Sequence, residues 1–313
     1  MVLKALLSAV SPQGEGARLS VFILHRVLAA QDPIFPDEMH ARRFDEWCSW
    51  IKAWFNVLPL DVAAARLQVG SLPARSACIT FDDGYADNHD IAAPILHKHG
   101  MPATFFIATG FLDGGRMWND TVIEAVRGAR AAVLDLGSLG QFGLGSSAER
   151  MAAIGGIIGK IKYLPIPERL AAAQEVAYAA QVSPPDDLMM SSAQVKTMRR
   201  LGMQIGAHTV SHPILATLDD AQARAEIKGS KDCLELLLGE RIGLFAYPNG
   251  KPGDDYVPQN VEVVRSLGFD AAVSTCWGAS RLGDDILQIK RFTPWDRSKL
   301  RFALRTLQNL RRS

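Results

Sequence analysis

The chain has 313 residues, and its 34 Lys and Arg nearly balance its 33 Asp and Glu, for a formal net charge of +1 at pH 7. Hydrophobic residues make up 48% and charged residues 21% of it, which is enough apolar material for a large core and argues against disorder. The near-neutral charge gives no support to nucleic-acid binding. This length fits two domains or a single barrel of alternating strands and helices.

Strands and helices alternate over most of the chain. Short apolar runs that end at polar residues or turns predict strands, and apolar residues at helical spacing predict the helices between them. Strands are expected at residues 19–24, 77–81, 103–108, 203–207, 244–247, 269–274 and 286–292. This alternation calls for a parallel sheet or barrel, and we predict an α/β fold.

Two regions depart from the alternation. From about 113 to 185 it gives way to a Gly/Ala/Leu-rich helical region, which we interpret as an insertion on the scaffold and not as a second domain. Residues 298–312 combine leucines at helical spacing with lysine and arginine, which predicts a C-terminal basic amphipathic helix. Such a helix usually docks on its own domain, with contact to an anionic membrane surface as the alternative. We therefore expect one domain over 1–313.

Cysteine usage and the first residues bear on the compartment. The four cysteines, at 48, 78, 233 and 276, are widely scattered and suit packed hydrophobic positions better than disulfides or a cysteine metal site. Residues 1–10 hold one positive charge and a short apolar run, soon followed by Pro12 and Gly14, so we expect no secretory signal there. No apolar run is long enough to span a bilayer, and the default expectation is a soluble cytoplasmic protein.

Two adjacent carboxylates, Asp82 and Asp83, follow the predicted strand at 77–81 and precede Gly84. Neighbouring side chains on an extended chain point to opposite sides, so the two need not serve the same purpose. Like charges this close are unfavourable unless a metal ion or an arginine lies nearby. Taken alone, the pair is explained about equally well by a functional role and by carboxylates that are solvated or cap the next helix.

Two histidines four residues apart, His208 and His212, follow the predicted strand at 203–207. One helical turn at that spacing would place both imidazoles on one side, where they could bind a single divalent ion. A carboxylate from another strand end would complete a set that leaves positions open for water and substrate, as catalytic sites do. An isolated pair of this kind more often fills a turn, but its combination with Asp82 and Asp83 favours a metal site.

Residues 80–84 (Thr-Phe-Asp-Asp-Gly) together with 208–212 (His-Thr-Val-Ser-His) resemble the polysaccharide deacetylase family, also called NodB-homology or carbohydrate esterase family 4 enzymes. Residues 24–27 (Leu-His-Arg-Val) and 117–120 (Met-Trp-Asn-Asp) resemble a bacterial subgroup linked to exopolysaccharide synthesis. The resemblance implies a distorted (β/α) barrel that hydrolyses N-acetyl groups on amino sugars with a divalent metal ion, zinc first among them. The implied partner is a glycan, either a polysaccharide, an oligosaccharide or a lipid-linked precursor, with contact to a membrane or a polysaccharide-assembly complex as a further option.

The resemblance also implies roles for single residues. Asp83, His208 and His212 would hold the metal, and Asp82 would be the general base for a metal-bound water that attacks the amide carbonyl. The metal and a backbone N–H, for which Asn249 is the candidate, would stabilise the oxyanion.

Two positions depart from the family's pattern. Ala246 stands where the family normally has an arginine that steadies the base, and residues 287–292 lack the histidine that normally serves as general acid. We hypothesise that Arg291 enters from the last strand and pairs with Asp82 in place of the missing arginine. His25, at the end of the first strand, is the candidate acid, and a hydrogen-bonded structural histidine is the alternative.

Aromatic residues near these motifs are candidates for contact with a sugar. Trp118 and Tyr247 could stack on a sugar face, although filling the core fits each of them equally well. The expected protein is a metal-dependent carbohydrate N-deacetylase. The alternatives are another amide hydrolase on the same scaffold, such as a sugar deformylase or a metal-independent allantoinase-like enzyme, and an inactive carbohydrate-binding protein. The retained base at Asp82 argues against the last of these, because a binding module needs no base.

Overall fold

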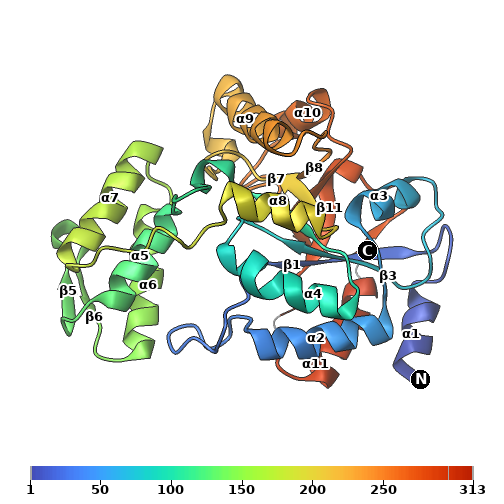
Figure 1. Ribbon diagram of the computed structural model, residues 1–313, viewed down its shortest axis with the longest axis horizontal. Coiled ribbons are helices and arrows are strands. Elements are labelled where there is room, and N and C mark those ends of the chain that lie inside the picture. Colours follow the sequence, from blue (N-terminus) through green and yellow to red (C-terminus); the bar gives the residue numbers. More distant parts are fainter. Residues whose placement is uncertain (1, 295, 312–313) are drawn as a thin grey trace.

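Seven parallel strands form a closed barrel in the computed structural model, which describes residues 2–294 and 296–311 (Figure 1). The strands are β1 (Arg18–Leu24), β3 (Ser76–Phe81), β4 (Thr104–Ile107), β7 (Gln204–Ala207), β8 (Leu244–Ala246), β9 (Ala271–Trp277) and β11 (Ile289–Phe292). They pair in the order β1-β11-β9-β8-β7-β4-β3, and the pairing of β3 with β1 closes the ring. The predicted α/β barrel is confirmed.

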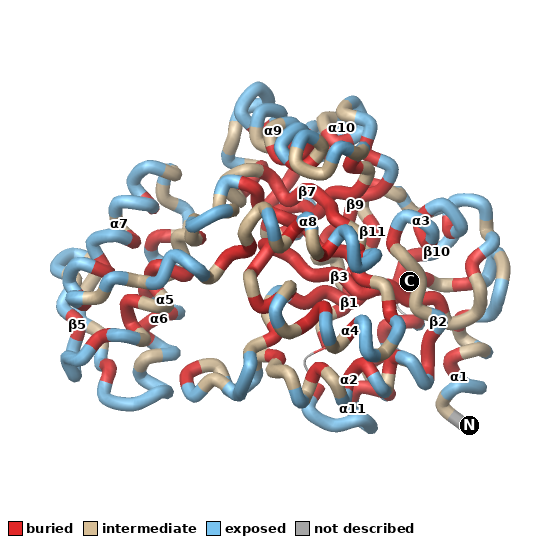
Figure 2. Tube along the Cα trace, in the orientation of Figure 1, coloured by how far each residue is buried: buried red, intermediate tan, exposed pale blue. Residues whose placement is uncertain are grey.

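Helices surround the barrel, and their outward faces are exposed while the strands are buried (Figure 2). They are α1 (Val2–Val10), α2 (Ala41–Trp54), α3 (Leu60–Gln68), α4 (Ala93–His99), α8 (Ser192–Arg200), α9 (Asp220–Leu238), α10 (Pro258–Ser266) and α11 (Lys299–Arg311). A π-helical turn (Asn88–Ala92) precedes α4, and 3-10 turns lie at Thr109–Phe111, Gly137–Leu139, Leu215–Thr217 and Ile286–Gln288. The last of these shortens the strand expected at 286–292. Two short strands, β2 (Asn56–Val57) and β10 (Ser280–Arg281), extend the sheet beside β3 and β1.

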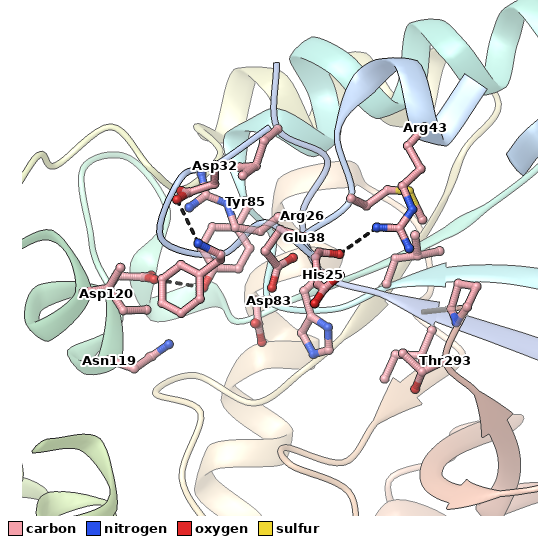
Figure 3. Close-up of a pocket in the computed structure, with 18 of the residues that line it drawn as sticks. His25, Arg26, Asp32, Glu38, Arg43, Asp83, Tyr85, Asn119, Asp120 and Thr293 are labelled. Carbon is pink, nitrogen blue, oxygen red and sulfur yellow. Dashed lines mark hydrogen bonds between the residues drawn. The ribbon is translucent and has the colours of Figure 1, made fainter. Parts of the chain in front are cut away.

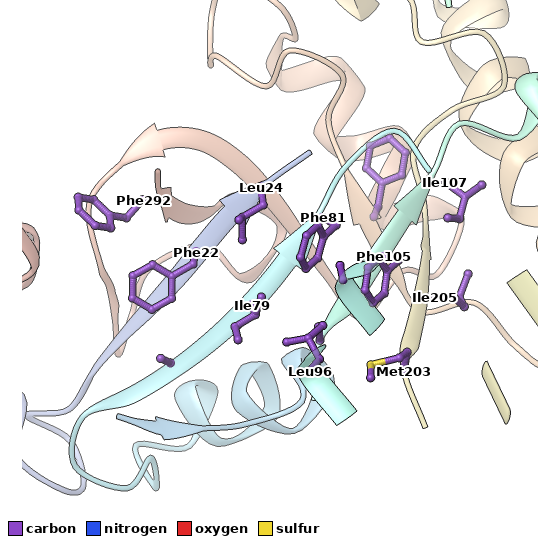
Figure 4. Packing of buried hydrophobic residues seen from close by; sticks show 14 of the residues in the cluster. Phe22, Leu24, Ile79, Phe81, Leu96, Phe105, Ile107, Met203, Ile205 and Phe292 are labelled. Carbon is purple, nitrogen blue, oxygen red and sulfur yellow. The ribbon is translucent and has the colours of Figure 1, made fainter. Parts of the chain in front are cut away.

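Alternation along the strands divides the core into an inner and an outer layer. Cys78 and Ile289 belong to a buried cluster made chiefly by strand residues, whereas Ile79 and Phe292 pack in the larger cluster shared with the helices (Figure 4). Burying each side chain of this size contributes roughly 1.5–3 kcal/mol. The same alternation continues to the strand ends, so Asp82 and Arg291 lie on the inner side with Cys78 and Ile289.

The segment expected as an insertion stands beside the barrel (Figure 1). It contains α5 (Trp118–Gly128), the antiparallel pair β5 (Val133–Asp135) and β6 (Gln141–Gly143), α6 (Ser147–Ile161) and α7 (Ile166–Ala179). Buried residues of the three helices, among them Val126, Ile157 and Val176, form a hydrophobic cluster separate from those of the barrel. The organisation as one domain with an insertion stays a prediction.

The C-terminal helix α11 packs one face against the barrel's outer layer. Phe302 is fully buried and stacks on Trp54 with ring centroids 5.8 Å apart. Leu300 and Leu304 are exposed on the other face, beside the basic side chains of the helix. Arg312, which was counted in the predicted helix, lies outside the described residues. Within residues 2–294 and 296–311, no helix combines the length and the apolar character needed to cross a membrane.

Candidate active site

The predicted site residues lie at the carboxyl ends of barrel strands. His25 follows β1, Asp82 and Asp83 follow β3, His208 follows β7, and Arg291 lies in β11. The carboxyl ends of parallel strands share one face of a barrel, where the loops that follow them build a common site. Residues that are far apart in sequence thus meet because the barrel closes.

Left-handed backbone is concentrated in the loops of this face. Asp83 (φ 77°), Thr209 (φ 64°), His212 (φ 53°) and Asn249 (φ 56°) all have positive φ although none is glycine. Such residues cost of order 1–3 kcal/mol each and persist where the surroundings impose them, most often at functional sites. The loops after β3, β7 and β8 are therefore strained in the places where the site residues lie.

The expectation of a helical turn from His208 to His212 is wrong. The segment is an irregular loop, because Thr209 and His212 adopt left-handed backbone that a helix excludes. Glu226 of α9 holds this loop by accepting hydrogen bonds from the N–H groups of Val210 (2.9 Å) and Ser211 (2.8 Å). The loop still brings the two imidazoles together, with ring centroids 4.8 Å apart.

Asp83, His208 and His212 form a compact set of donors for a metal ion. Oδ1 of Asp83 lies 3.4 Å from Nε2 of each histidine, and the three groups offer ligand atoms within 4.8 Å of one another. Nδ1 of His208 lies 2.7 Å from the carbonyl oxygen of Ala246, which can only accept, so Nδ1 carries a proton and Nε2 is the nitrogen that faces Asp83 and could bind a cation.

The fit of this triad to a cation rests on one buried atom. Oδ1 of Asp83 is inaccessible to solvent and has no hydrogen-bond donor among the residues that the structure describes. A buried carboxylate oxygen without a partner is costly, and a cation bound by the three residues would remove that cost. Two imidazole nitrogens and one carboxylate oxygen also match the ligand types of zinc. The residues present fit a divalent ion.

Asp82, the neighbour of Asp83, pairs with Arg291. The guanidinium Nη1 and Nη2 atoms donate to Oδ1 and Oδ2 of Asp82 at 2.7 Å each, and Nε donates to the Ser274 carbonyl oxygen at 2.8 Å. Asp82 is 3% and Arg291 1% exposed, so this is a buried, bidentate ion pair. The expected contact between the two residues is present, and Asp82 and Asp83 have separate partners.

Burial and charge act on the pKa of each group in opposite directions. Burial raises the pKa of Asp82, but the charge of Arg291 outweighs it and leaves that pKa below its ordinary value. Burial likewise raises the pKa of Asp83, and the neighbouring imidazoles bring it well below the usual range. Burial lowers the pKa of His212 to about 4, whereas the two carboxylates hold the pKa of His208 above its ordinary value despite burial. Both carboxylates are thus ionised at neutral pH, and His212 is neutral.

His25 and Asp83 line the same cavity, which has a volume of about 260 Å³ (Figure 3). The His25 side chain is exposed, and its backbone carbonyl accepts a hydrogen bond of 2.8 Å from the amide of Asn88. Glu38 and Tyr85 line other parts of the cavity wall. The structure therefore brings the candidate acid, His25, to the cavity that Asp83 also lines.

Two of the residues expected to bind substrate lie elsewhere. Tyr247 is fully buried and its ring stacks on Tyr256 with centroids 3.9 Å apart, so it cannot reach a sugar and the expectation is corrected. Trp118 is absent from the cavity wall, and its ring instead lies under the guanidinium group of Arg169 on α7 at 5.0 Å. Asn249 is half-buried after β8, and its role stays a prediction.

Sequence reasoning missed the residues of α5 that do line the cavity. Asn119 and Asp120 follow Trp118 directly and both face this space, with Asp120 only 2% exposed. The stretch from 117 to 120 was singled out, but aromatic character directed attention to its tryptophan. The signal that could have identified Asp120 is a carboxylate in the first turn of a helix. Such carboxylates are common on exposed helix ends, so Asp120 stands out only once its burial is known.

Fold and site together define a class of protein, a parallel barrel whose carboxyl-end face carries an ionised carboxylate and, next to it, three residues that could bind a metal ion. A family model described as polysaccharide deacetylase matches residues 70–272, well over half of the chain, and the chain belongs to that family. The enzyme class expected from the sequence, a hydrolase of carbohydrate N-acetyl amide bonds, is confirmed at the level of the family.

Known proteins resemble the chain over most of its length. YxkH of Bacillus subtilis (strain 168), whose name places it among polysaccharide deacetylases, is 20% identical over 266 residues, which cover 84% of this chain and 67% of that protein. The deacetylase PplD of Streptococcus pyogenes, solved in complex with acetate, has a TM-score of 0.62 at 18% identity and covers 93% of this chain and 98% of its own. IcaB of Ammonifex degensii also has a TM-score of 0.62 at 18% identity, with 96% and 98% covered. These structures share the fold.

Proposed function

We propose that the protein removes N-acetyl groups from the amino sugars of a glycan and that it does so with a divalent metal ion, zinc first among the candidates. The observation that carries this proposal is the pairing of two neighbouring carboxylates with different partners. Asp83 lies with His208 and His212, while Asp82 is held by Arg291. Membership of the polysaccharide deacetylase family supports the sugar amide as the bond that is cleaved.

Asp83, His208 and His212 would hold the ion. When bound, a divalent ion supplies Lewis-acid chemistry, polarising a carbonyl group and making water more acidic. The His208 ring is oriented by its hydrogen bond to the Ala246 carbonyl, and such supporting contacts fix the direction of a ligand's lone pair.

Asp82 would act as the general base. Its lowered pKa keeps it ionised at neutral pH, and each of its oxygens retains acceptor capacity beyond the bond from Arg291. A water molecule would lose its proton to Asp82 while its oxygen attacks the amide carbonyl carbon. Arg291 would hold the carboxylate in position, which makes it a positioning residue.

His25 would act as the general acid. The amide nitrogen leaves as an amine only if it gains a proton as the carbon–nitrogen bond breaks, and His25 lies in the wall of the same cavity as Asp83. Acetate and the free amino sugar are then the products. The backbone N–H of Asn249 is the proposed donor to the oxyanion.

The glycan itself is proposed from chemistry and from relatives. Carboxylates of Asp32, Asp37 and Glu38 and the guanidinium groups of Arg26, Arg43 and Arg127 line the cavity, and such polar walls suit the hydroxyl groups of a sugar. The PplD structure, solved with acetate, supports acetate as the released acid. The link to exopolysaccharide rests on residues 24–27 and 117–120 and stays a prediction.

Acetate release from a panel of N-acetylated hexosamine oligosaccharides tests the proposal. We expect zinc-loaded wild type to release acetate, Asp82→Asn to lose about 10²–10⁴-fold in kcat, and Asp232→Asn, an exposed change on α9, to match wild type. Formate among the products of a formylated panel would favour a sugar deformylase. Binding of the sugars with no acid released by wild type would favour a carbohydrate-binding protein.

A further inference from the structure

Helix α5 brings a buried carboxyl group from the insertion into the wall of the catalytic cavity. Asp120 is 2% exposed and lines the cavity together with Asp83 and His25. Figure 3 shows the three residues around one space, with Asn119 extending into it from the same turn of α5. The insertion therefore forms part of the site.

The two oxygens of Asp120 have different surroundings. Oδ1 accepts a hydrogen bond of 3.2 Å from the Tyr85 hydroxyl group. Oδ2 is buried and has no hydrogen-bond donor within the described part of the chain. The guanidinium group of Arg26 stacks over the Tyr85 ring at 4.7 Å, and its Nε donates to Asp87 at 2.7 Å.

An unpartnered buried oxygen costs about 1–3 kcal/mol, so a position of this kind suggests a missing partner. Tyr85 donates to Oδ1 and Asp120 lines the cavity, so a ligand in the cavity is the natural donor to Oδ2. Burial, reinforced by the charge of Asp83, raises the pKa of Asp120 to about 7, so the group exists as both acid and carboxylate near neutrality. A hydroxyl group, which both donates and accepts, can bond to either form.

We propose that Oδ2 of Asp120 hydrogen-bonds a ring hydroxyl group of the sugar whose N-acetyl group faces Asp83, and that it thereby selects and orients that sugar. This inference rests on the proposed function. Asp120 is a specificity-determining residue in this scheme and takes no part in proton transfer. Asn119, on the same turn, adds a second polar group to the same wall.

Deoxy sugars provide the test. Binding of N-acetylglucosamine and of its 3-, 4- and 6-deoxy analogues to the metal-free protein is measured by ligand-observed NMR. We expect one analogue to bind wild type at least tenfold more weakly than the parent sugar, the effect of losing one hydrogen bond to a charged group. We call the ratio of the analogue's dissociation constant to that of the parent sugar the penalty. It should fall below about threefold in the double variant Tyr85→Phe/Asp120→Leu, in which both polar partners are replaced by apolar groups of similar shape.

Two further variants separate recognition from structure. Tyr85→Phe alone leaves Oδ2 in place and should keep the wild-type penalty. If the double variant does not fold, Asp120→Asn replaces it, with the penalty expected between about two- and tenfold because a neutral hydrogen bond is weaker. Equal penalties in wild type and in the Asp120 variants would overturn the proposal, as would a wild type that does not bind N-acetylglucosamine.

The proposed function fails on a different measurement. Acetate release in wild type compared with Asp82→Asn decides the reaction, whereas the deoxy-sugar penalties are measured without metal and without turnover. Normal acetate release with unchanged penalties would overturn the role of Asp120 and leave the reaction intact. Asp135→Asn, an exposed change in the same insertion, should leave both acetate release and the penalties at wild-type values.

Discussion

Arg291 and Asp82 are 209 residues apart in the sequence, and they meet inside the barrel through two hydrogen bonds of 2.7 Å each. The guanidinium group enters from β11 and occupies both oxygens of a carboxylate that follows β3. Ala246 stands where the family normally has its arginine, and we propose that Arg291 performs that residue's task from another strand. We therefore expect changes to this buried ion pair to affect both stability and turnover.

Removing Arg291 alone should destabilise the protein. Arg291→Ala leaves the buried Asp82 charge without a partner, and we expect a loss of about 3–5 kcal/mol in the free energy of unfolding, measured in urea. Turnover should also fall, with an altered pH dependence, because burial without Arg291 raises the pKa of Asp82. The double variant Arg291→Met/Asp82→Leu should recover most of the stability, since apolar pairs often replace buried ion pairs without loss. Unchanged turnover in Arg291→Ala would contradict the positioning role.

Zinc binding should depend on the histidines of the triad. We expect wild type to bind one zinc ion by calorimetry and the double variant His208→Ala/His212→Ala to lose that binding, because only Asp83 remains. His97→Ala, an exposed histidine on α4, serves as the matched control and should bind zinc as wild type does. A wild type that binds no divalent ion would contradict the metal site and favour a metal-independent hydrolase.

His25 should be needed to cleave amides, whose leaving group is an amine, but not esters whose leaving group departs more easily. His25→Gln should lower kcat for an N-acetylated sugar by about 10²–10⁴-fold, because the amine must be protonated as it departs. An aryl acetate expels a phenolate without help and should be cleaved by this variant almost as by wild type. Asp82→Asn should lose activity on both substrates. Equal losses on amide and ester in His25→Gln would show that His25 is not the acid.

Asp120 should make stability fall as pH rises. Its pKa is about 7 in the folded protein, chiefly through burial, against about 4 in an unfolded chain, so the folded state holds a proton that the unfolded state releases between these values. The resulting stability is complete below pH 4 and is lost as pH rises through 7, at no more than about 1.4 kcal/mol per pH unit. Tyr85, Arg26, Asp83 and Glu124 are the charged or titratable groups that act on it.

The comparison with Asp120→Asn isolates this effect, because the amide does not titrate. Urea unfolding of both metal-free proteins between pH 4 and pH 8 should show wild type losing stability relative to the variant as pH rises. Other groups titrate in both proteins and largely cancel in the difference. A difference between the two proteins that stays constant over this range would mean that Asp120 has an ordinary pKa.

Local patterns in the sequence were enough to predict the strands, the barrel and the residues at the strand ends. Apolar runs that alternate with amphipathic helices can bury their surfaces only in a parallel α/β arrangement, and such an arrangement puts Asp83 and His208 on one face. The alternation of side chains also separated the roles of Asp82 and Asp83. Each of these inferences depends on only a few neighbouring residues or on a general rule of topology.

Contacts across the barrel were decided by the tertiary structure. The turn from His208 to His212 is not helical because Glu226 and the strained backbone hold a loop there, and Tyr247 is buried because Tyr256 covers it. Oδ2 of Asp120, which has no donor among the described residues, is buried because the insertion places its first helix against the cavity. Burial and hydrogen bonding depend on which segments meet, and segments far apart in the chain meet only when the fold closes.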